Sequence, residues 1–138
     1  MKVIVQRTSG NTFIAKGESN HWVVMDTDEK FGGNSAGSKP VELLLMALGG
    51  CTGMDIESLV NKMRTPVDDF RIEIEGERVD EHPKVFTRIE IVYKFWGKNL
   101  NEDNIKKAVE LSHTRYCTVS AILKKTCDIS YRIEINSD

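Results

Sequence analysis

The stretch Ser38–Cys51, SKPVELLLMALGGC, decides how this chain folds. Pro40 suits the first turn of a helix because its ring holds φ near the helical value, with Ser38 or Lys39 as the capping residue. Residues 43–48 are then apolar on every side, and a helix without a polar face is buried all round. A chain of 138 residues is too small to cover such a helix by itself. We therefore predict an obligate homodimer with no stable folded monomer.

The same helix continues beyond Cys51, where polar and apolar residues recur in the pattern of an amphipathic helix. It is expected to end near Arg64, because Thr65 precedes Pro66 and a residue before proline disfavours the helical conformation. The three glycines within two residues of Cys51 cost about 1 kcal/mol each relative to alanine. Such a cost indicates a close approach to the backbone, either by a packed helix or by a substrate beside the thiol.

The rest of the chain alternates predicted strands and shorter helices. Strands are predicted where apolar and polar residues alternate with a period of two, because one face then packs and the other meets water. The resulting order is three strands, the long helix, a hairpin, two helices and a last strand, which predicts one α+β domain over residues 1–138. The predicted strands are 2–7, 12–16, 22–25, 70–75, 85–95 and 129–135, and the shorter helices are 102–113 and 118–125.

Charge and hydropathy argue against several classes of partner. The chain has 19 Lys and Arg against 21 Asp and Glu, interleaved throughout, so it lacks the basic stripe that phosphate contacts need. It has no run of 18 apolar residues that would predict a membrane span. Residues 1–7 lack the apolar segment of a signal peptide. We therefore expect a cytoplasmic protein that binds neither nucleic acid nor membranes.

The three cysteines, an odd number, argue against the disulfide framework of a secreted protein. Each is then either a small buried apolar residue or a reactive thiol. Cys117 falls where one predicted helix stops and the next begins, and a helix N-terminus there would favour its thiolate. An ordinary buried cysteine at a helix junction is the other interpretation. Cys127, just before the last strand, is interpreted as structural.

Cys51 lies three turns inside its helix, beyond the first turn to which the helix dipole is confined. A thiolate at Cys51 would therefore need a cation from elsewhere in the fold or from a partner chain. Arg7, Lys30 and Lys39 are the candidates, and the sequence does not choose among them.

The histidines at positions 21, 82 and 113 are too scattered to show a metal-ligand spacing. His113 lies four residues before Cys117, so a continuous helix would place both on one face as a metal or base pair. A helix break near Thr114 would separate them instead. The glycine-rich segment 32–37 lacks the lysine of a phosphate loop, and is either a mobile lip over Cys51 or a simple loop. We expect no cofactor and no resident metal.

Two windows carry a resemblance to a known family: Ser38–Cys51, and Tyr116–Ser120 with the sequence YCTVS. In this order and separation they resemble the OsmC/Ohr family, and the order of predicted elements matches that family over nearly the whole chain. The segment Glu81-His82-Pro83 looks like one branch of it. The resemblance implies an OsmC-like α+β fold, in which antiparallel sheets wrap around a long central helix in an intertwined homodimer. It also implies active sites at the dimer interface.

The resemblance further implies a thiol-dependent peroxidase that reduces organic, and also inorganic, hydroperoxides in oxidative-stress defence. Cys51 would be the peroxidatic residue, which the hydroperoxide oxidises to a sulfenic acid. Cys117 would be the resolving residue, which closes a disulfide with Cys51. An external dithiol reductant would then reduce that disulfide.

The chain departs from the family in the groups that activate the first thiol. Peroxidatic members hold the thiolate with an arginine, oriented by a glutamate ten residues before the cysteine, where this chain has Val41. Glu42, nine residues before Cys51, lies on the opposite side of a straight helix and could face a partner chain. Arg7 is the only arginine before Arg64. Glu42 and Arg7 are therefore candidate site residues.

Two alternatives to the peroxidase stay open. One is a dimer of this fold that binds a small molecule or lipid. The other senses redox state or binds a metal through the same cysteines, without peroxidase turnover.

Overall fold

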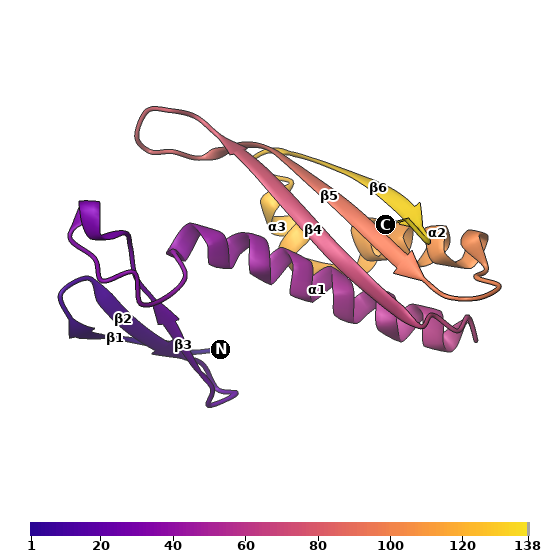
Figure 1. Cartoon of the computed structure of the whole chain (residues 1–138), viewed down its shortest axis with the longest axis horizontal. Coiled ribbons are helices and arrows are strands. Elements are labelled where there is room, and N and C mark those ends of the chain that lie inside the picture. Colours follow the sequence, from indigo (N-terminus) through magenta and orange to yellow (C-terminus); the bar gives the residue numbers. More distant parts are fainter. Residues whose placement is uncertain (138) are drawn as a thin grey trace. The chain divides into compact units, whose positions relative to one another are not determined.

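The structure is a computed structural model that describes residues 1–137. The predicted α+β order of elements is confirmed (Figure 1). The chain forms two compact units, Met1–Leu44 and a second that begins at Leu45. The elements are β1 (Ile4–Ser9), β2 (Thr12–Lys16), β3 (Trp22–Met25), the 3₁₀ turn η1 (Glu29–Phe31), α1 (Pro40–Lys62), β4 (Asp69–Arg78), β5 (Phe86–Trp96), α2 (Glu102–Leu111), the π turn η2 (Ser112–Tyr116), α3 (Thr118–Leu123) and β6 (Asp128–Ile135).

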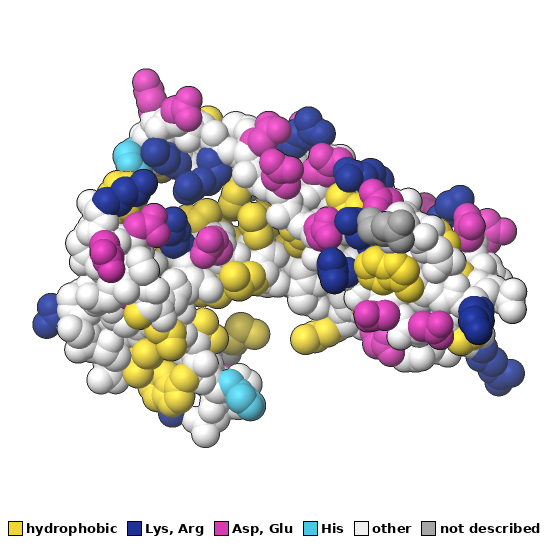
Figure 2. All heavy atoms as spheres, in the orientation of Figure 1, with side chains coloured by type: hydrophobic (Ala, Val, Ile, Leu, Met, Phe, Trp, Pro, Cys, Tyr) yellow, Lys and Arg dark blue, Asp and Glu magenta, His cyan; other side chains and the backbone are white. Residues whose placement is uncertain are grey.

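The first unit is an antiparallel sheet in the order β1-β2-β3. Its apolar side chains remain largely exposed, and Figure 2 shows apolar surface gathered over this sheet. The exposed set comprises Ile4, Val5, Phe13, Trp22, Val23 and Val24. A three-stranded sheet needs one covered apolar face for stability, and an exposed patch of this kind indicates an interaction surface.

The glycine-rich segment after β3 is organised around one buried carboxylate. Asp26 is 3% exposed and accepts hydrogen bonds from the Thr12 hydroxyl at 2.7 Å and from backbone N–H groups at 27, 34 and 36. The Thr12 hydrogen bond leads the effects that lower the pKa of Asp26. A Cβ at Gly33 would lie 2.0 Å from the carbonyl oxygen of Thr27, so only glycine fits there. Of the two interpretations of this segment, these contacts favour an ordered loop.

The second unit contains a sheet in the order β4-β5-β6. β4 and β5 form the predicted antiparallel hairpin, with Ile74 opposite Ile91. β6 pairs with β5 in parallel, with Tyr131 opposite Ile91, so the expectation of purely antiparallel sheets is wrong for this sheet. The chain passes through α2 and α3 between these strands, and such a long crossover is what a parallel pair requires.

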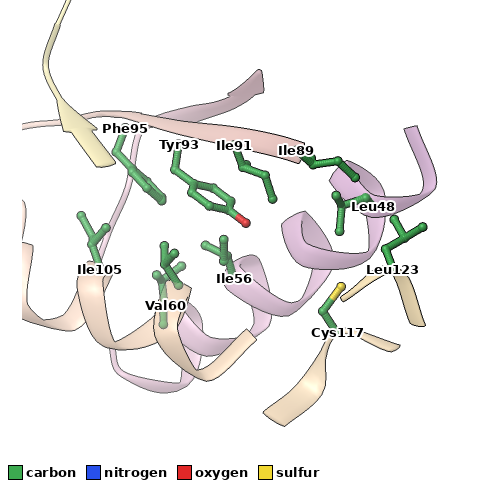
Figure 3. Packing of buried hydrophobic residues seen from close by; sticks show 12 residues of the cluster. Leu48, Ile56, Val60, Ile89, Ile91, Tyr93, Phe95, Ile105, Cys117 and Leu123 are labelled. Carbon is green, nitrogen blue, oxygen red and sulfur yellow. The ribbon is translucent and has the colours of Figure 1, made fainter. Parts of the chain in front are cut away.

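α1 packs one stripe of side chains against this sheet. Its fully enclosed positions recur every fourth residue and meet the inward side of β5, as Figure 3 shows. The stripe consists of Leu48, Thr52, Ile56 and Val60, and the facing residues of β5 are Ile89, Ile91, Tyr93 and Phe95.

The glycines around Cys51 serve this packing in part. A Cβ at Gly49 would lie 3.1 Å from Ile74, and one at Gly53 would lie 3.2 Å from Ile72. These two glycines therefore let α1 approach strand β4, so the close neighbour at these positions is a strand and not the packed helix of the first interpretation. A Cβ at Gly50 would meet nothing within 4 Å, because Gly50 is exposed and the space next to it is open.

The side of α1 that carries Met46 and Met54 is exposed, and so is Leu44, one turn before Leu48. By length and composition alone, α1 could also cross a membrane. The core helix of a soluble protein meets the same criteria, so this is weak evidence. The single domain and the homodimer both remain predictions.

Candidate active site

The second unit brings two of the three cysteines together. Cys51 is half-buried on α1, and Cys117 is 3% exposed at the start of α3. Their sulfur atoms and a carboxylate oxygen of Asp55 all lie within 4.8 Å of one another. Both thiols are free. The structure thus places the two predicted cysteines in one cluster and adds a carboxylate that sequence reasoning missed.

Local helix geometry positions Asp55. Residues four apart on a helix lie on one face, so Asp55 sits one turn beyond Cys51. This spacing is visible in the sequence, but the polar residues after Cys51 there look like the wet face of an amphipathic helix. Only the position of Cys117 shows that Asp55 faces the thiols.

The chain between α2 and α3 positions Cys117. α2 does not continue to Cys117, because η2 intervenes as a π turn, a feature that is frequent at functional sites. Cys117 ends this turn and caps α3, where its sulfur accepts a hydrogen bond from the backbone N–H of Ser120 at 3.4 Å. The Ser120 hydroxyl is fully buried and has no hydrogen-bond partner among the described residues.

Burial raises the pKa of the Cys117 thiol to about 11, although the Ser120 N–H opposes this shift. Cys51 and Asp55 raise the pKa further. The expectation that the start of a helix favours a Cys117 thiolate is therefore wrong: desolvation outweighs one backbone N–H, and Cys117 is a neutral thiol at pH 7.

A buried chain of hydrogen bonds holds Asp55. Its carboxylate accepts from the Ser112 hydroxyl at 3.0 Å, and Ser112 lies 2.8 Å from the Thr52 hydroxyl. Thr52 lies 2.8 Å from the Tyr93 hydroxyl, which lies 2.7 Å from Nε2 of His113. Side chains from α1, β5 and η2 therefore meet in one network that ends beside the thiols.

The hydrogen atoms in this network can be assigned. A carboxylate only accepts, and each hydroxyl has a single hydrogen to donate. Ser112 therefore donates to Asp55, and Thr52 and Tyr93 each donate to the next hydroxyl in that direction. His113 must then donate from Nε2 to Tyr93, which specifies its neutral tautomer.

Burial, followed by the charge of Lys124, lowers the pKa of His113 to about 4 and keeps the ring neutral. The ring also stacks on Tyr131, with centroids 4.5 Å apart. With Nε2 bound to Tyr93 and η2 breaking the helix, the structure favours separation over the alternative of a His113–Cys117 pair.

The predicted activating groups lie in the first unit. Arg7 is on β1, and Lys30 is in η1, with its ammonium group over the Phe31 ring. Glu42 accepts a hydrogen bond from the backbone N–H of Lys39 at 2.8 Å and so helps to cap α1. Lys39 forms an ion pair with Asp28 at 2.8 Å. The second unit forms the thiol cluster without any of them.

Cys127 is half-buried against the core, and its thiol contacts the Leu123 carbonyl oxygen at 3.7 Å. It is not part of the thiol cluster.

Comparisons with known proteins agree with this architecture. The sequence model of the family described as OsmC-like protein matches residues 32–132. Protein YhfA of Escherichia coli (strain K12) is 34% identical over 135 residues, which cover 98% of each chain. The crystal structure of a hypothetical protein from Aquifex aeolicus VF5 has a TM-score of 0.81 at 32% identity, covering 99% of this chain and 97% of that one. The organic hydroperoxide resistance protein OhrB of Bacillus subtilis has a TM-score of 0.67 over 96% of each chain; at 15% identity this likeness concerns the fold alone.

Proposed function

Because the chain belongs to the OsmC-like protein family, we propose that it is a thiol-dependent peroxidase that reduces hydroperoxides through Cys51 and Cys117. The proposal is supported above all by two free thiols whose sulfur atoms lie within 4.8 Å. Side-chain rotation has to close that separation to about 2.05 Å when a disulfide forms. OhrB is by name an organic hydroperoxide resistance protein, and the proposal extends that property to this chain.

Cys51 is the peroxidatic residue in this proposal, because it is the more accessible of the two thiols. Its thiolate attacks the terminal peroxide oxygen, so that an S–O bond forms while the O–O bond breaks. The alcohol leaves after taking up a proton. The sulfur is oxidised to a sulfenic acid and the peroxide is reduced.

Cys117 resolves the sulfenic acid. Its sulfur attacks that of Cys51, so that the S–S bond forms, the S–O bond breaks and hydroxide leaves as water. Because the pKa of Cys117 is about 11, its proton has to move during this step. In this proposal Asp55, within 4.8 Å of the sulfurs and oriented by Ser112, takes that proton and passes it to the leaving hydroxide, which departs as water. An external dithiol then restores both thiols.

The substrate class follows from the surroundings of Cys51. The preceding turns of α1 are apolar and Gly50 leaves open space, which favours an organic hydroperoxide over hydrogen peroxide. The reducing cytoplasm is the proposed location, because it keeps such thiols reduced. The proposed context is oxidative-stress defence by a homodimer.

The test treats fully reduced protein with an organic hydroperoxide. Wild type and Cys127→Ser should consume about one equivalent and gain a Cys51–Cys117 disulfide, detected by mass spectrometry of peptides. Cys51→Ser should consume none. Cys117→Ser should form a sulfenic acid that over-oxidises, because the first step needs one thiol. If the wild-type protein consumes no peroxide, the proposal is wrong.

Redox sensing without turnover is the second candidate function. It is favoured by the charge around the thiols, because the leading effects on the Cys117 pKa include a carboxylate and no cation. A sensor would form the same disulfide once and slowly, and added dithiol would not sustain consumption. A peroxidase consumes many equivalents under those conditions.

A further inference from the structure

Cys51, Asp55 and Cys117 form a compact set of metal-ligand atoms: two sulfurs and one carboxylate oxygen within 4.8 Å of one another. We propose that the reduced cluster binds one thiophilic divalent cation, Zn²⁺ in the first place, and that metal binding and disulfide formation exclude each other. The binding site stands on the geometry alone. Its effect on peroxide reduction rests on the function proposed above.

The donor types and spacing suit zinc. Zn–S bonds of about 2.3 Å and Zn–O bonds of about 2.1 Å place tetrahedral ligands roughly 3.5–3.8 Å apart. The cluster therefore has to contract by about 1.3 Å at most, which side-chain rotation of two cysteines and an aspartate can supply. Thiolate donors select Zn²⁺ over Mg²⁺ and Ca²⁺, which prefer oxygen ligands. Three protein ligands leave a fourth position for water.

The framework around the cluster resembles a prepared metal site. Cys51 and Asp55 come from one face of α1, and η2 holds Cys117 opposite them. The Ser112 hydroxyl binds Oδ2 of Asp55 and leaves Oδ1 available as a ligand. Hydrogen bonds of this kind orient metal ligands and strengthen binding. The buried network that ends at Asp55 is therefore the outer shell of the proposed site.

The charge of the cluster also calls for a cation. Metal binding displaces the proton of each thiol, and the two thiolates and one carboxylate then carry three negative charges at one place. Among residues 1–137, Asp55 forms no ion pair with a lysine, arginine or histidine. A divalent cation would compensate most of this charge without any change in the fold.

Zinc binding and disulfide formation both use the sulfur atoms of Cys51 and Cys117, so the two processes compete. On metal binding each thiol releases one proton, two bonds to zinc form and no atom changes oxidation state. On oxidation the two sulfurs bond to each other and give two electrons to a hydroperoxide, which becomes an alcohol and water. A sulfur pair held by zinc cannot form the disulfide, and the disulfide no longer offers thiolates to zinc.

The test measures zinc on the reduced full-length chain, by competition with a chromophoric chelator and by metal analysis after dialysis. Wild type and the matched control Cys127→Ser should bind one zinc per chain. Cys51→Ser and Cys117→Ser should bind none, and Asp55→Asn should bind at least about tenfold more weakly. Circular dichroism of each variant checks the fold. The absorption spectrum of the Co²⁺ form should show thiolate bands in wild type that are lost in Cys117→Ser.

Two results would overturn the inference: no zinc bound by the reduced wild type, or binding that depends on Cys127 and not on Asp55. Peroxide consumption, measured with zinc and with a chelator, separates this inference from the proposed function. Zinc should slow consumption at least about tenfold. If the protein consumes peroxide but binds no zinc, the proposed metal site is wrong and the proposed peroxidase activity stands. If the protein binds zinc but the metal-free protein consumes no peroxide, the proposed peroxidase activity is wrong and the proposed metal site stands.

Discussion

At the scale of single residues, the neutral His113 ring makes stability depend on pH. Its pKa is about 4 in the folded chain, against an ordinary value of 6.5, so the unfolded chain takes up the proton more readily. The contribution is therefore present above pH 6.5 and is lost as the pH falls towards 4. We expect the free energy of unfolding of wild type to fall by about 2–3 kcal/mol over this range from His113, measured by urea denaturation.

His113→Gln should remove the part of the fall in the free energy of unfolding between pH 6.5 and 4 that comes from His113. The side-chain amide of glutamine can donate to Tyr93 without titrating in this range. The matched control is His82→Gln, since His82 is exposed in the β4–β5 turn. His82→Gln should show the same fall in the free energy of unfolding between pH 6.5 and 4 as wild type. Equal slopes for wild type and His113→Gln between pH 6.5 and 4 would contradict the assignment of the neutral ring.

At the scale of elements, the Tyr93 hydroxyl ties β5 to α1 and η2. It is buried and hydrogen-bonded to Thr52 and His113, so its removal leaves Nε2 of His113 without this acceptor and Thr52 with only its hydrogen bond to Ser112. Tyr93→Phe should therefore lower the free energy of unfolding by about 1–3 kcal/mol, measured by chemical denaturation at pH 7. This loss of stability comes from the hydrogen bonds that connect β5 to α1 and η2, because the phenylalanine ring still fills the core.

Tyr131→Phe is the control for this prediction. Tyr131 stacks on His113 through its ring and is 40% exposed, and the substitution keeps that ring. Its effect should stay within about 0.5 kcal/mol. If both substitutions cost the same, the network does not hold the elements together.

At the scale of the whole molecule, the uncovered side of α1 predicts assembly. Met46 is 53% exposed and Met54 76% exposed, and the sheet of the first unit, described by itself, likewise carries exposed apolar side chains. We expect sedimentation at low micromolar concentration to give the mass of two chains. Met54→Glu should shift the protein towards monomers and lower its thermal stability, because a charge is costly in an apolar interface.

Lys106→Glu serves as the control, because Lys106 is exposed on α2 and the substitution adds negative charge there, twice as much as Met54→Glu adds. It should leave the dimer intact. A wild-type chain that is a well-folded monomer at low micromolar concentration would refute the argument from the uncovered helix.

Local periodicity was enough to determine the order of the elements. The alternation in β4 and β5 and the helical pattern of α1 depend on neighbours along the chain, and such patterns are readable in one dimension. The stripe of α1 that is buried, Leu48 to Val60, differs from the expectation that residues 43–48 are enclosed on every side. The pairing of Cys51 with Cys117 was predicted through resemblance, and the structure confirms that the two thiols are close. The parallel pairing of β6 was missed, because strand direction depends on the path of the crossover and not on residue pattern.

Only the tertiary structure decided what surrounds the thiols. Asp55 looks like one more polar residue of an amphipathic helix until η2 places Cys117 beside it. The pKa of Cys117 likewise depends on burial by distant elements, which reversed the expectation drawn from its place at a helix start. Sequence patterns report contacts between near neighbours, whereas desolvation and charge act through space between residues that the fold alone brings together.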